Sequence, residues 1–277
     1  MAEATFDRAS FAEALRTRSF GHRLIVRAEV GSTNDVAWDA LAEGAPDGVT
    51  IVADAQTQGR GRAGRTWHTA PGLGLALSIA LHPGCDRRQQ GTLPLVAGLA
   101  LAEGLEALGV RPRLKWPNDV LVGNRKLAGI LCESRRLPLP GGALTDVVVL
   151  GVGVNVAQRA EDFPTELGES ARLAPTSLAL EGHAATREAV AAAFLNALEP
   201  LWTEHAEGGR EQVLERWRAR ADFWGRPVTV RTPTGAVSGT ARALDADGGL
   251  VVALEGGGET TVLAGDLDVV QAESGAS

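Results

Sequence analysis

Asp54-Ala-Gln-Thr-Gln-Gly-Arg-Gly-Arg-Ala-Gly-Arg-Thr-Trp67 is the stretch around which the chain is organised. It places three arginines and three glycines between two apolar, strand-like runs. Glycine reaches positive φ angles at no steric cost, and guanidinium groups pair well with anions, so this backbone can wrap closely around a negatively charged ligand. We therefore predict an anion-binding loop, called the arginine loop below. Its glycines and arginines are Gly59, Arg60, Gly61, Arg62, Gly64 and Arg65.

Composition limits the classes of partner that the protein can have. A chain of 277 residues with 44% apolar content can fill the core of one large domain, or of a large and a small one. A formal charge of −7 argues against a general nucleic-acid or anionic-membrane surface, because those partners are usually met by basic faces. Cys85 and Cys132 lie in no metal-ligand spacing, and the N-terminus lacks the features of a signal peptide. We expect a soluble cytoplasmic protein.

Hydrophobic periodicity predicts that the arginine loop joins one strand to another. A helix is expected after Ser32 or Thr33, either of which can cap it, and Gly44 is placed to end it. The other segments predicted in this region are a helix over 7–18 and strands over 49–53 and 73–81.

Beyond the loop, the pattern predicts a mainly antiparallel mixed sheet with helices. Pro117-Asn118 and Gly123-Asn124 are turn signals that separate short apolar runs. The predicted strands cover 113–116, 119–122, 127–132 and 147–156, and the predicted helices cover 93–108, 187–204 and 210–220.

The character of the sequence changes near residue 222. Residues 223–270 consist of short Val, Thr and Leu runs separated by turns such as Asp247-Gly248-Gly249, a pattern typical of a small five-strand barrel. We therefore expect a catalytic domain over 1–222, a small barrel over 223–270 and a frayed tail over 271–277.

Familiar phosphate-binding motifs do not explain the arginine loop. Gly59-x-Gly61-x-x-Gly64 matches the dinucleotide fingerprint, but that motif requires a helix after the third glycine, and here a strand follows. A P-loop pattern is also absent, so any ATP would be held by arginine and backbone contacts. The alternative that uses no ligand is a solvated hairpin loop with arginines for solubility.

Three further motifs are each compatible with an ordinary structural role. Trp116-Pro117-Asn118-Asp119 is a turn, but its amide can also pair with a base such as adenine. Lys126 is followed by small residues that would let a ligand lie close to the backbone, although lysines at hairpin ends are commonly just solvated. Gly151-Val-Gly153-Val-Asn155 is either a bulge or a close-approach site.

Taken in order, these motifs resemble the biotin protein ligase family. The order is Ser-Thr-Asn, then a glutamine and the arginine loop, then Lys-Trp-Pro-Asn-Asp, Lys-Leu-Ala-Gly-Ile-Leu and Gly-Val-Gly-Val-Asn, and the resemblance covers the whole chain. It implies an α+β fold: a mixed sheet with helices, related to class II aminoacyl-tRNA synthetases and lipoyl ligases, followed by an SH3-like β-barrel. Fewer residues precede Ser32 than the family's DNA-binding domain needs, so a monofunctional ligase is expected.

The resemblance also implies roles for individual residues, with biotin and ATP as substrates and Mg²⁺ as the metal ion. Lys126 and Arg62 are expected to be catalytic, Asp119 is a candidate for assisting proton removal or orienting Mg²⁺, and the metal ligands are unknown. The residues expected to bind biotin are Ser32, Thr33, Asn34, Gln56, Gly59, Arg60, Gly61, Arg62, Lys126 and Gly129. The residues expected to bind ATP or the adenylate are Arg62, Arg65, Trp67, Trp116, Asn118, Asp119, Lys126 and Asn155.

The expected activity is ATP-dependent formation of biotinyl-5′-AMP, followed by transfer of biotin to a lysine of a biotin carboxyl carrier domain. The arginine loop would then be a lid over the adenylate, which water would otherwise hydrolyse. Two alternatives remain: a lipoate or octanoate ligase of the same superfamily, and a non-catalytic ligand-binding regulator. No nucleic acid or membrane partner is expected, and both a monomer and a homodimer are compatible with the sequence.

Overall fold

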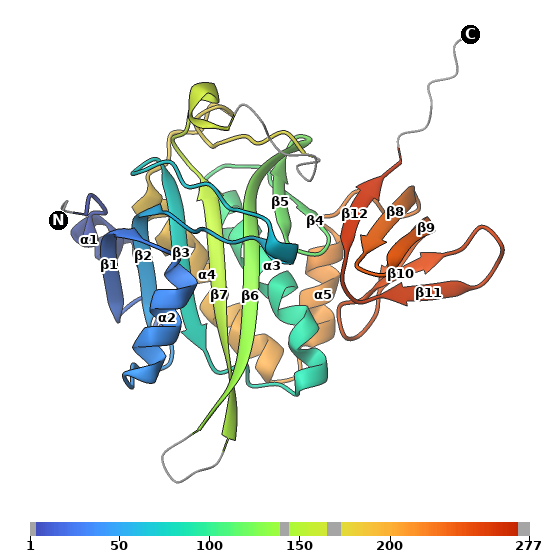
Figure 1. The fold of residues 1–277 in the computed structure, drawn as a ribbon, viewed down its shortest axis with the longest axis horizontal. Coiled ribbons are helices and arrows are strands. Elements are labelled where there is room, and N and C mark those ends of the chain that lie inside the picture. The colour runs from blue at the N-terminus through green and yellow to red at the C-terminus, as the bar shows by residue number, and fades with distance from the viewer. Residues whose placement is uncertain (1–3, 139–143, 165–172, 271–277) are drawn as a thin grey trace.

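A seven-stranded mixed sheet is the main element of the fold (Figure 1). The computed structural model describes residues 4–138, 144–164 and 173–270, so the predicted tail over 271–277 lies outside the described residues. The strand order is β1-β2-β3-β7-β6-β5-β4; β1 and β2 are parallel, and the other neighbours are antiparallel. The strands are β1 (Leu24–Val30), β2 (Thr50–Gln56), β3 (Gly74–Leu81), β4 (Arg113–Lys115), β5 (Asp119–Val122), β6 (Arg125–Pro138) and β7 (Leu144–Asn155).

Helices cover both faces of this sheet (Figure 1). The helix α2 lies on one face, and α3, α4 and α5 lie on the other, where α1 packs against α4. Short 3₁₀ turns complete the described helical segments. The helices and turns are α1 (Arg8–Ala14), α2 (Thr33–Ala42), η1 (Arg62–Gly64), η2 (Arg87–Thr92), α3 (Leu93–Ala107), η3 (Ala160–Asp162), α4 (Arg187–Ala206) and α5 (Arg210–Arg218).

The helix α3 is apolar on nearly all sides because it is enclosed between the sheet and α4. Gly104 allows the close approach of the two helices, since a Cβ added there would lie 2.7 Å from the carbonyl oxygen of Ala193. The other face of the sheet has its own smaller core, in which Trp38 of α2 packs near Ile51 and Val149. The central strand β3 is therefore buried along its whole length, and it reads as a continuous apolar run.

Two predicted elements differ most from their bounds in the structure. The helix predicted over 7–18 ends at Ala14, because Leu15 is extended and the Arg16 backbone N–H donates to Asn196 of α4. The strand predicted over 127–132 extends to Arg125–Pro138. Its added residues are mostly polar, so apolar periodicity could not reveal them. Arg125 and Lys126 pair with β5, and residues 133–138 pair with β7 in a hairpin.

The C-terminal part forms a five-stranded antiparallel sheet, as the turn pattern predicts. Its buried apolar residues and those beneath the large sheet form one continuous hydrophobic core. The indole nitrogen of Trp116, between β4 and β5, donates to the carbonyl oxygen of Gly248 at 3.0 Å. The strands are β8 (Pro227–Thr232), β9 (Gly235–Leu244), β10 (Leu250–Ala253), β11 (Glu259–Val262) and β12 (Asp266–Val269), in the order β11-β10-β9-β8-β12.

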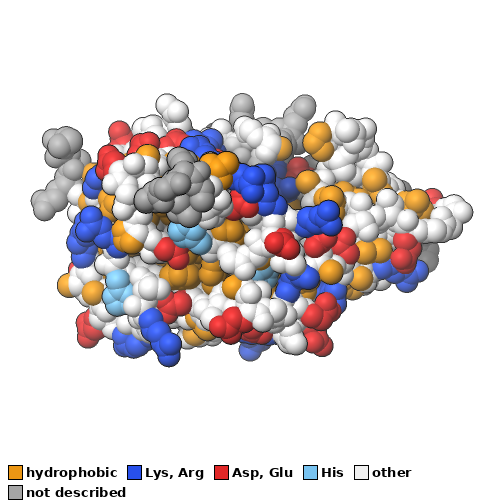
Figure 2. Space-filling model, turned by 90° about the horizontal axis from the view of Figure 1, so that it is seen from below, with side chains coloured by type: hydrophobic (Ala, Val, Ile, Leu, Met, Phe, Trp, Pro, Cys, Tyr) orange, Lys and Arg blue, Asp and Glu red, His pale blue; other side chains and the backbone are white. Residues whose placement is uncertain are grey.

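The surface seen in Figure 2 carries acidic and basic side chains intermixed, without a stripe of one sign among the described residues in view. No helix in residues 4–138, 144–164 and 173–270 has both the length and the apolar character needed to cross a bilayer.

Candidate active site

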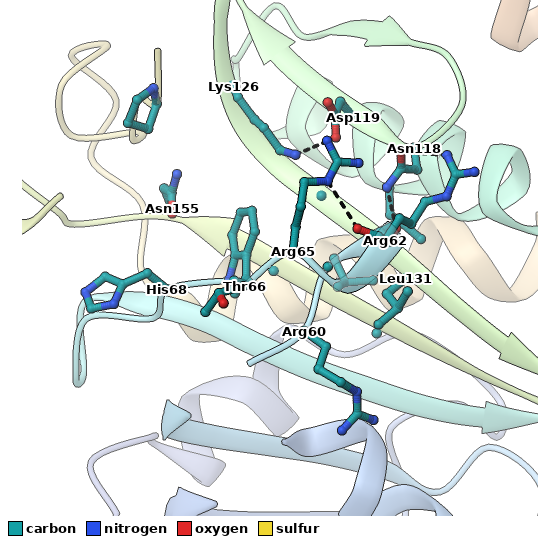
Figure 3. Close-up of a pocket in the computed structure, with 18 of the residues that line it drawn as sticks. Arg60, Arg62, Arg65, Thr66, His68, Asn118, Asp119, Lys126, Leu131 and Asn155 are labelled. Carbon is teal, nitrogen blue, oxygen red and sulfur yellow. Dashed lines mark hydrogen bonds and ion pairs between the residues drawn. The ribbon is translucent and has the colours of Figure 1, made fainter. Parts of the chain in front are cut away.

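A cavity of about 510 Å³ lies over the large sheet, below the arginine loop and beside the start of β12. Its walls come from the N-terminus of α2, the end of β2, the arginine loop, the β4–β5 turn, β6 and β7. Figure 3 shows labelled residues of the arginine loop, the β4–β5 turn, β6 and β7 lying around the same space. All the residues that the sequence predicts for the site except Gly59 line this cavity.

One end of the cavity is a buried, neutral polar cluster at the N-terminus of α2. Thr33 donates to Gln56 Oε1 from its backbone nitrogen at 2.9 Å and from its hydroxyl at 3.1 Å. Ser78 of β3, which the sequence did not single out, has its hydroxyl 2.7 Å from Thr33 Oγ1 and 2.6 Å from Asn34 Oδ1. Ser32, the N-cap residue, is buried beside them. These groups present fixed hydroxyl and amide dipoles.

The arginine loop is a hairpin that folds back on itself. The Trp67 backbone N–H donates to the carbonyl oxygen of Gly59 at 2.9 Å, and Gly61 donates to that of Arg65 at 2.6 Å. Of the three loop glycines, which are all free to adopt positive φ, only Gly64 does so, at +74°. Gly59 is required for another reason: a Cβ there would lie 2.3 Å from the Trp67 carbonyl oxygen. Among the described residues, the only non-glycine with positive φ is Ala63, at 53°.

The three arginines of the loop point in different directions (Figure 3). Arg60 makes two contacts of 2.7 Å with Asp35 and one of 3.3 Å with Glu133. Arg65 pairs with Asp266 of β12 at 2.7 Å. The sequence reasoning found none of these three acids, because nothing local in the chain links them to the loop.

Arg62 is the arginine of the loop that remains available for an anion. Its contacts are long: 3.4 Å to Asn118 Oδ1 and 3.5 Å to the carbonyl oxygen of Gly265. No ion pair joins it to a carboxylate within the part of the chain that the structure describes. Burial lowers the pKa of Arg62, an effect that the nearby Asp266 partly offsets. A partly buried guanidinium with weak partners is suited to receive a phosphate or a carboxylate.

Lys126 lies at the same end of the cavity. Its Nζ atom is 2.6 Å from Asp119 Oδ1 and 5.8 Å from the centre of the Trp67 ring. Lys115, which belongs to the Lys-Trp-Pro-Asn-Asp motif but was given no role, also lines the cavity. Burial lowers the pKa of Lys115, an effect that the nearby Asp119 partly offsets.

The Trp67 side chain lies directly on β7. A Cβ added at Gly153 would be 2.3 Å from the indole ring, and one at Gly129 of β6 would be 3.4 Å from it. The two glycines therefore make room for an aromatic ring on the floor of the cavity. Trp67 is placed to stack against a flat ligand group.

Other predicted nucleotide-side residues reach the cavity but are bonded within the protein. Asn118 donates to the Ile130 carbonyl oxygen at 2.7 Å, and Asn155 donates to that of Thr176 at 2.9 Å. Trp116 is only 2% exposed, and its indole nitrogen is bonded to Gly248, so it supports the wall of the site. No group of three or more His, Cys, Asp or Glu side chains that could hold a metal ion occurs within residues 4–138, 144–164 and 173–270.

Two protein-family models match the chain, one in the part with the large sheet and one in the C-terminal part. The model of the Biotin/lipoate A/B protein ligase family matches residues 27–155, and the model of the Biotin protein ligase C terminal domain matches residues 223–270. These matches assign the fold to the class of biotin and lipoate protein ligases.

Curated relatives narrow this class. The chain is 36% identical to the biotin--[acetyl-CoA-carboxylase] ligase of Mycobacterium tuberculosis, with 88% of each chain covered. It is 35% identical to the enzyme of the same name from Paracoccus denitrificans, over 81% of this chain and 92% of that one. A biotin protein ligase from Aquifex aeolicus, solved with biotin and ATP, superposes with a TM-score of 0.72 at 28% identity, covering 91% of this chain and 100% of that one. The chain belongs to the biotin protein ligase family.

Proposed function

We propose that this protein activates biotin with ATP, as biotinyl-5′-AMP, and transfers the biotin to a lysine of a biotin carboxyl carrier domain. One observation carries the proposal. A single cavity has a neutral hydrogen-bonding end, at Thr33, Asn34 and Gln56, and a cationic end, at Arg62 and Lys126. Biotin has a neutral ureido ring at one end and a carboxylate at the other, and the two ends of the cavity match these groups in order.

The neutral end would hold the ureido ring. That ring has one carbonyl acceptor and two N–H donors, and hydroxyl and amide side chains can supply both kinds of partner. Thr33, Asn34 and Gln56 are buried or partly buried and are oriented by hydrogen bonds within the cluster, including those of Ser78; Ser32 is buried beside them. Because their orientations are already fixed, little ordering is needed when the ligand binds.

The cationic end would carry the first chemical step. A carboxylate oxygen of biotin attacks the α-phosphorus of ATP, the bond to the bridging oxygen breaks, and pyrophosphate leaves. The carboxylate and the α-phosphate are both anions and repel each other as they approach. Lys126 and Arg62 would lower the activation barrier because they neutralise charge on the carboxylate and the phosphoryl oxygens. Lys126 would exchange its Asp119 partner for these oxygens. This step uses no protein nucleophile.

Magnesium fits this site as a companion of ATP. Mg²⁺ is commonly bound through substrate phosphates, water and only one or two carboxylates. Asp119, at the cationic end, is the carboxylate that could join such a set. When bound, the ion would neutralise phosphate charge.

The second step requires protection and proton removal. The mixed anhydride is hydrolysed by water, and the arginine loop lies where it can cover the adenylate beside Trp67. The amine of the acceptor lysine attacks the carbonyl carbon, AMP leaves, and an amide forms. A free lysine has a pKa of about 10.4, so a base must take its proton, and Asp119 is the proposed candidate for assisting this removal.

The proposal also covers the domain boundaries of the chain, its cellular compartment and its binding partner. A catalytic part over 1–222 and a small domain over 223–270 are supported by the end of α5 at Arg218 and the start of β8 at Pro227. Two free thiols, Cys85 and Cys132, are compatible with a reducing cytoplasm. The carrier domain is the proposed partner; neither nucleic acid nor membrane is part of the proposal.

Incubation with ATP, Mg²⁺, biotin and a biotin carboxyl carrier domain tests this function, with the mass of the carrier as the readout. We expect one biotin to be added to the carrier, and no addition when lipoate or octanoate replaces biotin, because the neutral cluster matches a ureido ring better than an apolar chain. Addition of lipoate alone would favour the related ligase activity. Binding of biotin without transfer to a competent carrier domain would favour a ligand-binding regulator and contradict the proposal.

A further inference from the structure

Two carboxylates beside the neutral end of the cavity, Asp35 and Glu133, have no part in the chemical steps above. Both terminal nitrogens of the Arg60 guanidinium contact Asp35 at 2.7 Å, and one of them also contacts Glu133 at 3.3 Å. Asp35 follows the buried cluster in the first turn of α2, and Glu133 lies on β6. Arg60 therefore joins the loop to two elements of the scaffold.

Glu133 has a second set of contacts, with the buried cluster. Its Oε2 atom accepts hydrogen bonds from Asn34 Nδ2 at 3.1 Å and from Trp38 Nε1 at 2.9 Å. The other end of the Asn34 amide, Oδ1, accepts from Ser78 at 2.6 Å. A donor on one side and a carboxylate on the other allow the Asn34 amide only one orientation. A single carboxylate thus contacts the ureido-binding cluster with one oxygen and the arginine loop with the other.

The geometry makes Arg60 a poor candidate for binding a substrate anion. Its guanidinium already forms a two-bond fork with Asp35 at short distances, the arrangement in which arginine and carboxylate pair best. The Arg60 hydrogen bond is the first cause that lowers the pKa of Asp35, so this carboxylate is charged at neutral pH. Arg62, by contrast, has only long contacts.

We propose that Asp35 and Glu133 are positioning residues that fix Arg60 as the anchor of the arginine loop, and that Glu133 also orients Asn34 for biotin. The biotin part of this inference rests on the proposed function, whereas the loop part does not. Within the described residues, the Asp35 carboxylate hydrogen-bonds only to Arg60 of the loop, whereas the Glu133 carboxylate hydrogen-bonds to both the loop and the cluster. Removing the two acids therefore has separable effects.

A series of variants distinguishes these effects. Glu133→Ala removes both sets of contacts. Glu133→Gln keeps one oxygen that can still accept from Asn34 and Trp38, but turns an amide N–H₂ group toward Arg60. Asp35→Asn weakens the loop contact alone. Asp146→Asn is the matched control, because Asp146 lies on β7 of the same hairpin, pairs with Arg136 at 3.3 Å and is outside the cavity.

The first measurement is biotin binding by titration calorimetry without ATP. Hydrogen bonds to a charged group are the stronger kind, so we expect Glu133→Ala to raise the Kd for biotin about tenfold. Glu133→Gln, Asp35→Asn and Asp146→Asn should stay within about twofold of the wild type. An unchanged Kd in Glu133→Ala, or equal losses in Glu133→Ala and Asp35→Asn, would overturn the assignment of Asn34 orientation to Glu133.

The second measurement, limited cleavage by trypsin, does not depend on enzymatic activity. Brief trypsin treatment of the native protein is followed by mass spectrometry of cleavage after Arg60, Arg62 or Arg65, all of which every variant retains. We expect severalfold faster cleavage in the loop for both Glu133 variants and for Asp35→Asn, and the wild-type rate for Asp146→Asn. Equal rates in all proteins would overturn the anchor. Failure of the wild type to bind biotin would count against the proposed function, while the trypsin result would still decide the anchor.

Discussion

At the scale of single residues, the cations of the site differ in what they contact before any substrate binds. Lys126 is paired with Asp119 at 2.6 Å, whereas Arg62 has only two long contacts with neutral oxygens. The incoming phosphate must therefore displace Asp119 from Lys126, but it can bind Arg62 without breaking an ion pair. This difference fits a role for Lys126 at the reacting groups and for Arg62 in holding the ligand.

Replacing Lys126 by alanine should abolish most of the adenylation step and retain the fold. The lysine is needed where charge develops, and the loss of one such group commonly costs about 10²–10³-fold in rate. Release of pyrophosphate with saturating biotin and ATP measures the step. Arg136→Ala, which removes an exposed cation of the β6–β7 hairpin outside the cavity, is the control. Wild-type release by Lys126→Ala would show that the lysine is misassigned.

A second residue-scale prediction concerns the floor beneath Trp67. Gly153→Ala would place a methyl group 2.3 Å from the indole, so the ring must move off β7. Because stacking on the ring is lost, we expect the KM for ATP to rise by roughly tenfold, with little change in biotin binding. Gly256→Ala, where the added methyl group meets open space, should behave as the wild type. If Gly153→Ala kept the wild-type KM for ATP, stacking on Trp67 would have no part in nucleotide binding.

At the scale of elements, the arginine loop is held at several points. Arg60 joins it to α2 and β6, Trp67 packs on β7, and Arg65 joins it to Asp266 of β12. Arg62, on the 3₁₀ turn of the loop, faces the cavity between these attachments. A ligand phosphate bound to Arg62 would therefore add the attachment that the loop lacks.

Arg62→Ala should weaken biotin binding and shorten the lifetime of the adenylate. The loop would lose the contact through which the ligand closes it, and water would reach the anhydride. Single-turnover reactions without acceptor, quenched at intervals and assayed for bound biotinyl-AMP, measure the lifetime; Arg136→Ala is again the control. The lid assignment fails if the two variants retain adenylate equally long.

Local sequence patterns correctly predict many of the helices and strands around the site. The turn glycines and apolar periods identified the strands on both sides of the arginine loop. Of the two residues predicted as possible caps of α2, Ser32 and Thr33, Ser32 occupies the N-cap position. The carboxylate partners of the loop could not be found in the same way. Glu133 is 73 positions from Arg60 in sequence and Asp266 is 201 positions from Arg65, so only the folded sheet brings them together.

The site residues illustrate the same limit. Motif order correctly predicted that Asn34, Lys126 and Asn155 meet in one cavity. It gave no information on which hydrogen bonds each side chain has already made inside the protein. The Asn155 amide is bonded to Thr176, and the Arg60 guanidinium is bonded to two acids, so both are less available for ligand than their positions suggest.

At the scale of the whole molecule, the small C-terminal sheet completes the site instead of standing apart from it. Asp266 and Leu267 of β12 line the cavity, and the Trp116 indole is bonded to the turn at Gly248. The two parts also share one hydrophobic core. Loss of packing in this core should therefore affect catalysis through the position of the loop.

The buried His205 of α4 makes the stability of this shared core depend on pH. Burial is the main cause that lowers its pKa below the usual 6.5, and its ring is 2.7 Å from the Thr92 hydroxyl. Between the lowered pKa and 6.5 the unfolded chain binds more protons than the folded one, so the free energy of unfolding falls as the pH drops below 6.5.

His205→Gln should reduce this pH dependence. Urea midpoints measured at about pH 7.5 and about pH 5.5 are expected to differ less in this variant than in the wild type. His22→Gln, a change at an exposed site, should keep the wild-type difference. An equal difference in all three proteins would mean that His205 does not contribute to it.

The central claim is that the cavity joins biotin and ATP into an acyl-adenylate, and isotope exchange tests this most directly. In the presence of Mg²⁺, ATP and labelled pyrophosphate, reversal of the first step transfers label into ATP only if biotin is activated. We predict exchange that requires biotin, does not occur with lipoate, and is lost in Lys126→Ala. Exchange that is independent of biotin, or its absence in a wild-type protein that binds both substrates, would contradict the claim.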